Sequence, residues 1–146
     1  MPYTHSLAQA GRGSSISIGA TPTLIGEITD IPLDLPKWDS VDVTNLESGS
    51  DQENLLTVRK SATFTVKGNR VSTDAGQVAV ISAYQNATLS AFVVTLPKTA
   101  TQTTTGDTYS FSAFVMSASF DVSPTKQVDF SMDLMTSGPV TFTAGS

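Results

Sequence analysis

The chain has 146 residues, a formal net charge of −5 and no cysteine, and this length suits one domain with its own core. Charged residues make up only 14%, against a usual share of about 25%, so Ser, Thr, Asn and Gln must form much of the polar surface. The lack of cysteine excludes disulfides and thiolate chemistry. No basic stripe is present, which argues against nucleic-acid binding through phosphate contacts.

The N-terminal segment carries little apolar surface. Residues 1–14 are rich in Gly and Ser, which predicts a flexible N-terminal arm ahead of a single domain at 15–146. This start also lacks the apolar core of a secretory signal, and no run approaches the ~20 apolar residues that cross a bilayer. We therefore expect a protein made in the cytoplasm that has no membrane contact.

Alternating apolar residues predict the first strands of the domain. The alternation begins at Ile16, continues over Leu24–Ile31, and returns at Trp38–Thr44 and Ser61–Lys67. Between the last two strands lies a long, mostly polar segment, Asn45–Lys60. Hairpin loops usually need only about 2–5 residues, so this segment predicts a long hairpin loop with a role of its own.

The segment STDAGQVAVISAYQNATL predicts the one helix of the chain. Asp74 can cap its N-terminus, and Gln77 stands three residues later, where the partner of a capping box belongs. Val78, Ile81 and Tyr84 recur at helical spacing. The alternating valines also fit a strand, which is the alternative.

The C-terminal half reads as further strands. SAFVVTLP predicts a short buried strand, Lys98–Asp107 a Thr-rich loop, and Tyr109–Val122 a long strand that is apolar on much of both faces. Val140–Thr143 adds a last short strand. Over Gln127–Met135 the two faces differ: the predicted core face carries Val128, Phe130, Met132 and Leu134, and the polar face carries Gln127, Asp129, Ser131 and Asp133.

Together these elements predict a mainly β fold: a β-sandwich or small barrel of antiparallel strands, with one packed α-helix and a long hairpin loop. The titratable residues indicate no catalytic device. His5 is the only histidine and lies in the predicted arm, where no third group would orient it. Five carboxylates lie between Glu27 and Asp42. A calcium site or a glycosidase pair is the functional alternative, but turn and surface positions explain them. We expect no enzyme activity, no metal and no cofactor.

The order of the elements carries a further signal. The informative segments are GEITDIPLDL, WDSVDVTNLESGSDQENLL, SATFTVKG, the helix after STDAG, and the C-terminal VDFSMDLMTSGPVTFT. They cover most of residues 15–143 and contain no short invariant motif. This order resembles that of the major tail tube proteins of long-tailed, lambda-like (siphovirus-type) bacteriophages.

The resemblance implies a structural protein of the virion tail. Members of that family form six-subunit rings, which stack into a hollow tube for genome delivery, and sheets of neighbouring subunits join into a continuous inner barrel. The implied partners are further copies of the chain, the tape-measure protein, and the tail terminator and baseplate proteins. DNA would be present only in transit through the lumen.

Two sets of residues are candidate sites under this interpretation. A polar segment that becomes ordered only on binding would contact the next subunit or ring, although a tolerated surface insertion is the plainer alternative. We expect this contact at Glu47, Ser48, Gly49, Ser50, Asp51, Gln52, Glu53 and Asn54. The polar face of the strand Gln127–Met135 would line the lumen, which gives Asp129, Ser131 and Asp133 as candidates.

Three other functions remain open from the sequence. The first is the tube of a contractile tail or of a related injection or gene-transfer particle. The second is an arrayed decoration protein. The third is a binding module, which would need an aromatic platform such as Trp38 with Tyr109, although single aromatic residues more often serve in packing.

Overall fold

A computed structural model describes residues 11–146 of the chain. Residues 1–10 lie outside the described part, and with them His5 and most of the predicted arm. Residues 11–14 form a turn in which the Ser14 N–H donates to the Gly11 carbonyl at 3.1 Å.

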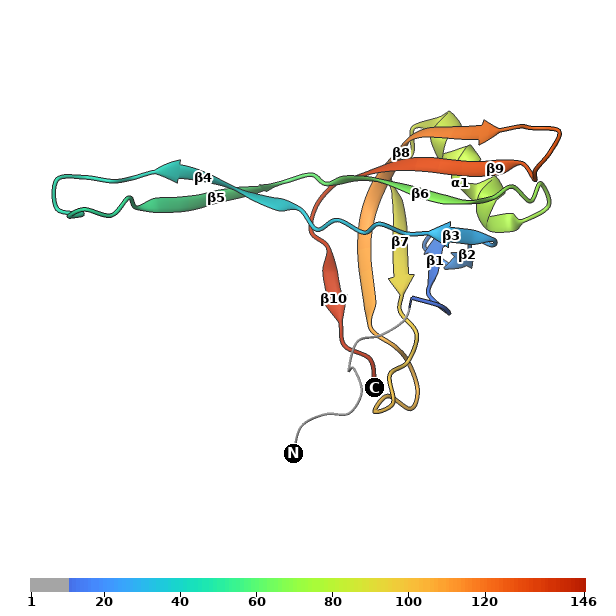
Figure 1. Ribbon diagram of the computed structural model, residues 1–146, viewed down its shortest axis with the longest axis horizontal. Coiled ribbons are helices and arrows are strands. Elements are labelled where there is room, and N and C mark those ends of the chain that lie inside the picture. The colour runs from blue at the N-terminus through green and yellow to red at the C-terminus, as the bar shows by residue number, and fades with distance from the viewer. Residues whose placement is uncertain (1–10) are drawn as a thin grey trace.

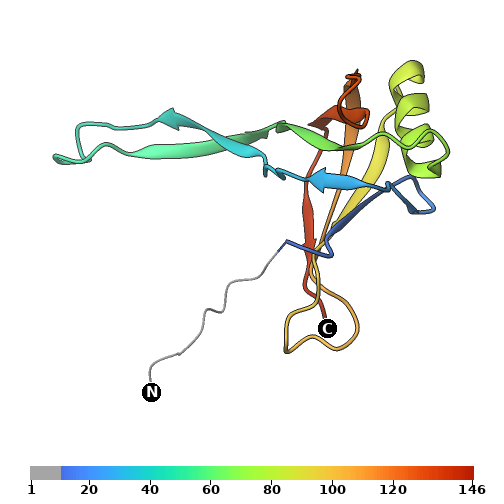
Figure 2. The same cartoon turned by 45° about the vertical axis from the view of Figure 1, so that its right-hand side comes forward.

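One large antiparallel sheet organises the described chain, and it confirms the predicted mainly β fold. Seven of its eight strands follow the order β2-β1-β7-β8-β9-β6-β3, and β10 pairs beside β8. The sheet curls on itself, and helix α1 packs against β8, β1 and β2 (Figures 1 and 2). The elements are β1 Ser15–Ile18, β2 Thr23–Leu24, β3 Ile28–Asp30, β4 Lys37–Asp42, β5 Asn54–Lys60, β6 Thr63–Asn69, α1 Ala75–Asn86, β7 Ser90–Thr95, β8 Thr108–Asp121, β9 Asp129–Thr136 and β10 Thr141–Thr143.

The hydrophobic core lies on the inner face of the curled sheet. β9 supplies Phe130, Met132 and Leu134, which are all buried, so the predicted alternation of this strand is confirmed. The Phe111 ring of β8 stacks on Phe92 and meets other core side chains edge-on. The core also includes Ile16, Ile18, Ile25, Phe64, Val66, Val80, Ala83, Val94, Ala113 and Val115.

A β-bulge changes which side chains of the long strand β8 point toward the core. The register against β9 shifts between Val115 and Ser117, which inserts one extra residue at Met116. Phe120 consequently stands opposite Phe130, and their rings stack with centroids 5.8 Å apart. Unbroken alternation would place Phe114, Met116 and Phe120 on one face, but the bulge reverses the alternation and leaves no marker in the sequence.

Helix α1 begins where the sequence predicted, but its buried face differs. The Asp74 carboxylate accepts the Gln77 backbone N–H at 3.0 Å and caps the helix. The Gln77 side chain is fully buried; it donates to the Asn69 carbonyl at 2.8 Å and accepts the N–H of Val71 at 3.0 Å. This amide fastens the helix to the end of β6, so it does not form a reciprocal capping box.

The side of α1 that faces the core carries Val80 and Ala83. Val78 and Tyr84 are about half exposed, so the apolar positions that indicated the helix in the sequence lie on its outer side. The helix itself is confirmed, and the strand alternative is wrong.

The long segment after β4 is a strand for half of its length. Asn54–Lys60 forms β5, which pairs with β4 in a separate two-stranded sheet. The expectation of a loop over Asn45–Lys60 is therefore wrong for its second half, which is a strand. Thr57 and Val58 favour extended backbone, and β4 offers this segment a partner although no core covers either strand.

Phe130 gives a direct test of this core. Phe130→Ala should lower the free energy of unfolding by about 3–5 kcal/mol, because the ring is 1% exposed and its loss leaves a cavity. Phe142→Ala is the matched control, since that ring is 53% exposed and its truncation leaves no enclosed void. Equal losses in urea denaturation would contradict the assigned core.

Candidate assembly surfaces

The β4–β5 hairpin extends from the body of the protein as an arm (Figure 1). Every residue of β5 is exposed, and so is every residue of β4 except Asp39. Cross-strand pairs alternate between the two faces: Lys37 pairs with Lys60, Trp38 with Arg59, and Val41 with Leu55. Neither face of the arm packs on the rest of the described chain.

The tip of the arm is held by local hydrogen bonds. The Asn45 side chain accepts the Glu47 N–H at 2.8 Å, and the Ser48 hydroxyl accepts the Asn45 N–H at 3.0 Å. The Thr44 hydroxyl accepts the Glu53 N–H at 2.8 Å across the hairpin. The predicted contact residues therefore sit in a defined turn, and Asn54 is the first residue of β5.

Large apolar side chains lie along both faces of the arm. Trp38 and Leu56 lie on one face, whereas Val41 and Leu55 lie on the other, and Val58 stands at the bulge of β5; each is about half exposed or more. An isolated two-stranded hairpin is at best marginally stable in water, and contiguous exposed apolar surface marks an interaction site. The arm is therefore the strongest candidate contact surface of the molecule. From the sequence, the contact was predicted at the polar tip. The apolar residues of β4 and β5 were not predicted to take part.

The root of the arm, where β4 begins and β5 ends, is basic and aromatic. The Arg59 guanidinium lies 5.3 Å from the centroid of the Trp38 ring, which is a cation–π contact. Lys60 lies 3.8 Å from the Asp39 carboxylate. Trp38 thus belongs to the arm, whereas the Tyr109 ring packs on Phe142 in the body at 5.3 Å between centroids. The two aromatics contact different partners and form no common platform.

The second candidate surface is the outer face of β6, β9 and β8, opposite the core. Rows of paired residues cross this face: Thr65 with Asp133 and Ser117, and then Lys67 with Ser131 and Ser119. The hydroxyls of Ser119 and Ser131 hydrogen-bond each other. The structure brings the predicted lumen candidates onto this one face, which is polar in its central rows.

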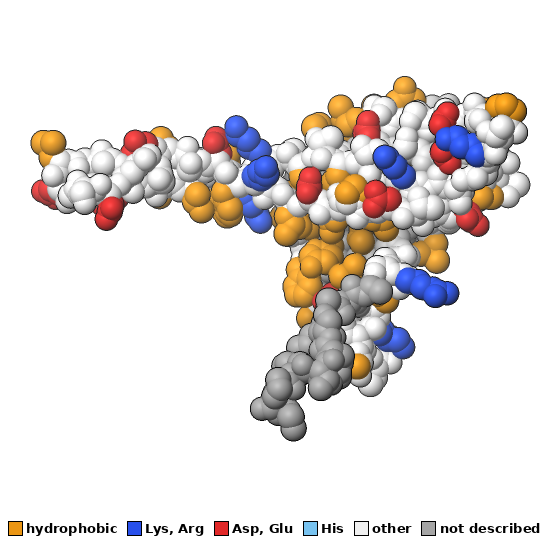
Figure 3. Space-filling view, viewed as in Figure 1, with side chains coloured by type: hydrophobic (Ala, Val, Ile, Leu, Met, Phe, Trp, Pro, Cys, Tyr) orange, Lys and Arg blue, Asp and Glu red, His pale blue; other side chains and the backbone are white. Residues whose placement is uncertain are grey.

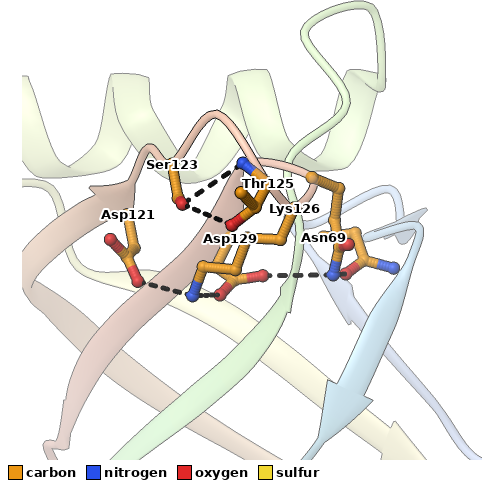
Figure 4. A network of polar contacts seen from close by, with 7 residues as sticks. Asn69, Asp121, Ser123, Thr125, Lys126 and Asp129 are labelled. Carbon is orange, nitrogen blue, oxygen red and sulfur yellow. Dashed lines mark hydrogen bonds and ion pairs between the residues drawn. The ribbon is translucent and has the colours of Figure 1, made fainter.

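At the end of this face lies an ion-paired network (Figure 4). The Lys126 ammonium group lies 2.8 Å from the Asp121 carboxylate and 3.0 Å from that of Asp129. The hydrogen bonds that Lys126 donates to these two carboxylates, Asp121 first, raise the pKa of Lys126. The positive charge of Lys126 thus partly neutralises Asp129, a pairing that no local sequence pattern indicates.

Asp133 is the most tightly bound carboxylate of the face. The hydroxyls of Thr65 and Ser117 both donate to it, the latter at 2.7 Å. These hydrogen bonds, Thr65 first, lower the pKa of Asp133 below its ordinary value of 3.8. The carboxylate is therefore ionised at neutral pH and fixes three neighbouring strands to one another.

Other kinds of site find little support in the described chain. Residues 11–146 contain no group of three or more His, Cys, Asp or Glu side chains that would hold a metal ion, and the five carboxylates from Glu27 to Asp42 do not gather. Within the same residues, no helix has the length and apolarity required to cross a bilayer.

Comparison with solved structures places the fold among tail tubes. A chain from the tail of an empty gene transfer agent particle, refined with helical and C6 symmetry, is 20% identical with a TM-score of 0.74, covering 94% of this chain and 100% of that one. A chain of the SPP1 tail tube is 15% identical with a TM-score of 0.62, covering 91% and 77%. A chain of the sheath-tube complex of a PVC extracellular contractile injection system is 17% identical with a TM-score of 0.62, covering 90% and 88%.

These likenesses show that the chain has the fold of the tube subunits of phage tails and related particles. No protein-family model matches the sequence, and no curated protein matches it. The likeness is therefore one of backbone architecture, which agrees with a resemblance that extends along the chain without a short motif.

Asp133 gives a pH test of the polar face. Asp133→Asn should be less stable than the unchanged protein at pH 7 by about 1 kcal/mol, because two hydroxyls lose a charged acceptor. A lowered folded-state pKa stabilises above the ordinary value of 3.8 and loses that contribution as the pH falls through the lowered value. The difference should thus shrink below pH 3.8. Asp51→Asn at the exposed tip is the control, and a difference that is independent of pH would contradict the assignment.

Proposed function

We propose that this chain is the tube subunit of a phage-like tail, in which rings of the protein stack into a hollow conduit for genome delivery. The observation that carries the proposal is a tail tube fold bearing a long arm with two exposed apolar faces. A monomer gains nothing from such an arm. In a stacked assembly, neighbouring copies bury both faces.

Ring formation is supported by the open ends of the large sheet. Its outermost strands, β2 and β3, have only two and three residues. Short edge strands of this kind limit uncontrolled pairing, and a closed ring of copies would cover the edges that remain. The C6 symmetry of the gene transfer agent tail makes six copies per ring the number we propose.

We assign the outer face of β6, β9 and β8 to the lumen, with Ser131 and Asp133 at its centre and Asp129 at its end. Duplex DNA must pass such a wall without binding to it. Serine and threonine hydroxyls with ionised carboxylates give that property, because they offer phosphate few positive partners. Lys67 lies on this face and Lys126 at its end, and the two lysines are outnumbered by Asp121, Asp129 and Asp133.

The proposed location is the virion tail, after synthesis in the host bacterial cytoplasm. The proposed partners are further copies of the chain along the tube, a terminator and a baseplate protein at its ends, and a tape-measure protein and then DNA inside. In this role the protein contributes shape and surface, and it performs no catalysis.

A tube enclosed by a sheath is the second candidate. It is favoured by the outer side of α1, which has no charged residue and exposes Val78 and Tyr84, and by the fold shared with a sheath-tube complex. Val78→Lys should leave tubes intact under both functions, and it should prevent the binding of a sheath protein only under the second.

Removal of the tip of the arm tests the proposal. Replacing residues 43–53 by Asn-Gly would close the Asp42–Asn54 pair with a two-residue turn. The monomer should remain folded, because the removed residues are all partly or fully exposed, and tubes should be absent in negative-stain microscopy. Ser50→Ala is the control and should form tubes. Tubes of normal length from the truncated chain would show that the tip of the arm is no assembly contact.

The lumen assignment can be tested by labelling, because the chain has no cysteine. In assembled tubes, Ser119→Cys should react with a small maleimide and resist a maleimide carrying a bulky polymer, whereas the monomer should react with both. Gln85→Cys, exposed on α1, should react with both reagents in either state. Equal reaction of Ser119→Cys with the bulky reagent in tubes would place this face outside.

A further inference from the structure

The arm carries opposite charges at its two ends. Residues 41–58 contain four carboxylates and no Lys or Arg, whereas three of the eight basic residues of the chain stand at the root. Figure 3 shows the Lys and Arg side chains gathered near the body and the Asp and Glu side chains spread toward the tip. The acidic residues are Asp42, Glu47, Asp51 and Glu53, and the basic ones are Lys37, Arg59 and Lys60.

These two groups of charges cannot satisfy each other within one molecule. Even Asp42, the nearest of these carboxylates along β4, is five positions from Lys37, which is about 17 Å of extended chain, and charges are screened over about 8 Å at physiological salt. Within residues 11–146, no ion pair involves a carboxylate of the tip, and the Lys60–Asp39 contact is the only ion pair at the root. The complement of each end must come from another molecule.

The acidic tip also presents an apolar knob. Leu46 is fully exposed, and the hydrogen bonds of the flanking Asn45, Glu47 and Ser48 hold the turn that carries it. A leucine that contacts nothing in its own chain, on a turn of defined shape, has the properties of an interface anchor.

The basic root presents a hollow that matches this knob. A depression of about 400 Å³ lies between the arm and the β9–β10 turn, and Pro36, Trp38 and Pro139 form its apolar wall. Arg59 and Lys60 also line it. The Arg59 guanidinium covers part of the Trp38 ring, which keeps one positive charge beside the apolar wall.

We propose that the tip of one copy docks into the root hollow of a second copy, with Leu46 against Trp38 and Pro139 and the tip carboxylates against Arg59 and Lys60. One chain carries both surfaces of this contact: an acidic tip with an exposed leucine, and a basic root with an apolar hollow. Such a heterologous contact leaves a free tip and a free root at its ends, so it repeats from copy to copy. The inference rests on the proposed function and adds the identity of the surface that receives the arm.

Site-specific cross-linking tests the contact directly. Leu46→Cys with Pro139→Cys in one chain, treated with a short bis-maleimide after assembly, should give a ladder of covalent multimers. Leu46→Cys with Gln85→Cys is the control and should give none. Tubes of the first variant that yield no ladder, or a ladder from the control, would overturn the proposed docking.

Charge exchange provides the second test. The tip variant combines Glu47→Lys, Asp51→Lys and Glu53→Lys; the root variant combines Lys37→Glu, Arg59→Glu and Lys60→Glu. Each alone should need about tenfold more protein to polymerise. An equimolar mixture should polymerise again, because each reversed tip meets a reversed root. Lys98→Glu, in the β7–β8 loop, is the control and should behave like the unchanged protein.

The outcomes separate this inference from the proposed function. If the unchanged protein forms no ring or tube under any condition, the function fails. If it forms tubes and the mixture does not recover, or if neither variant is impaired, only the docking of tip to root is wrong. The monomer could instead bind a duplex DNA fragment and lose this binding in the root variant. That result would show that the basic root binds phosphate groups, and it would also overturn the docking.

Discussion

The structure depends on a two-stranded sheet that has no core of its own. β4 and β5 satisfy each other's backbone groups, but both of their faces stay exposed and carry large apolar side chains. Two strands alone give a marginal structure in water. A folded body can hold the root of such an arm in position, yet only a partner can remove its apolar surface from water. The need to bury this apolar surface links the fold to assembly. The rest of the chain holds the root of the arm in position.

The body of the protein is built on a sheet whose two faces differ in polarity. Its inner face is closed by α1 and by a core whose aromatic rings come from Phe64, Phe92, Phe111 and Phe130. Its outer face is polar over β6, β9 and β8, where hydroxyls and carboxylates bond across strands. Such a face is stable beside water and offers few charges that would hold DNA. The same sheet can thus serve stability on one side and a channel on the other.

The sequence predicted those features that depend on local alternation or on local capping. The core face of β9 follows from the period of two, and the start of α1 follows from Asp74. The sequence could not predict that the side chains of β8 exchange faces at Met116, because a β-bulge adds one residue without a sequence marker. Gln77 was expected to cap the helix, but its burial beside Asn69 arises from tertiary packing. The root hollow joins residues near 36, 58 and 139, which no local pattern connects.

The central claim is that assembly buries the arm, and hydrogen–deuterium exchange measures this directly. In the monomer, the amides of β4 and β5 should exchange quickly, because a hairpin without a core opens readily. In the assembled polymer the same amides should be strongly protected, while those of β9 should be protected in both states. Fast exchange of the arm in the polymer, equal to that in the monomer, would contradict the account.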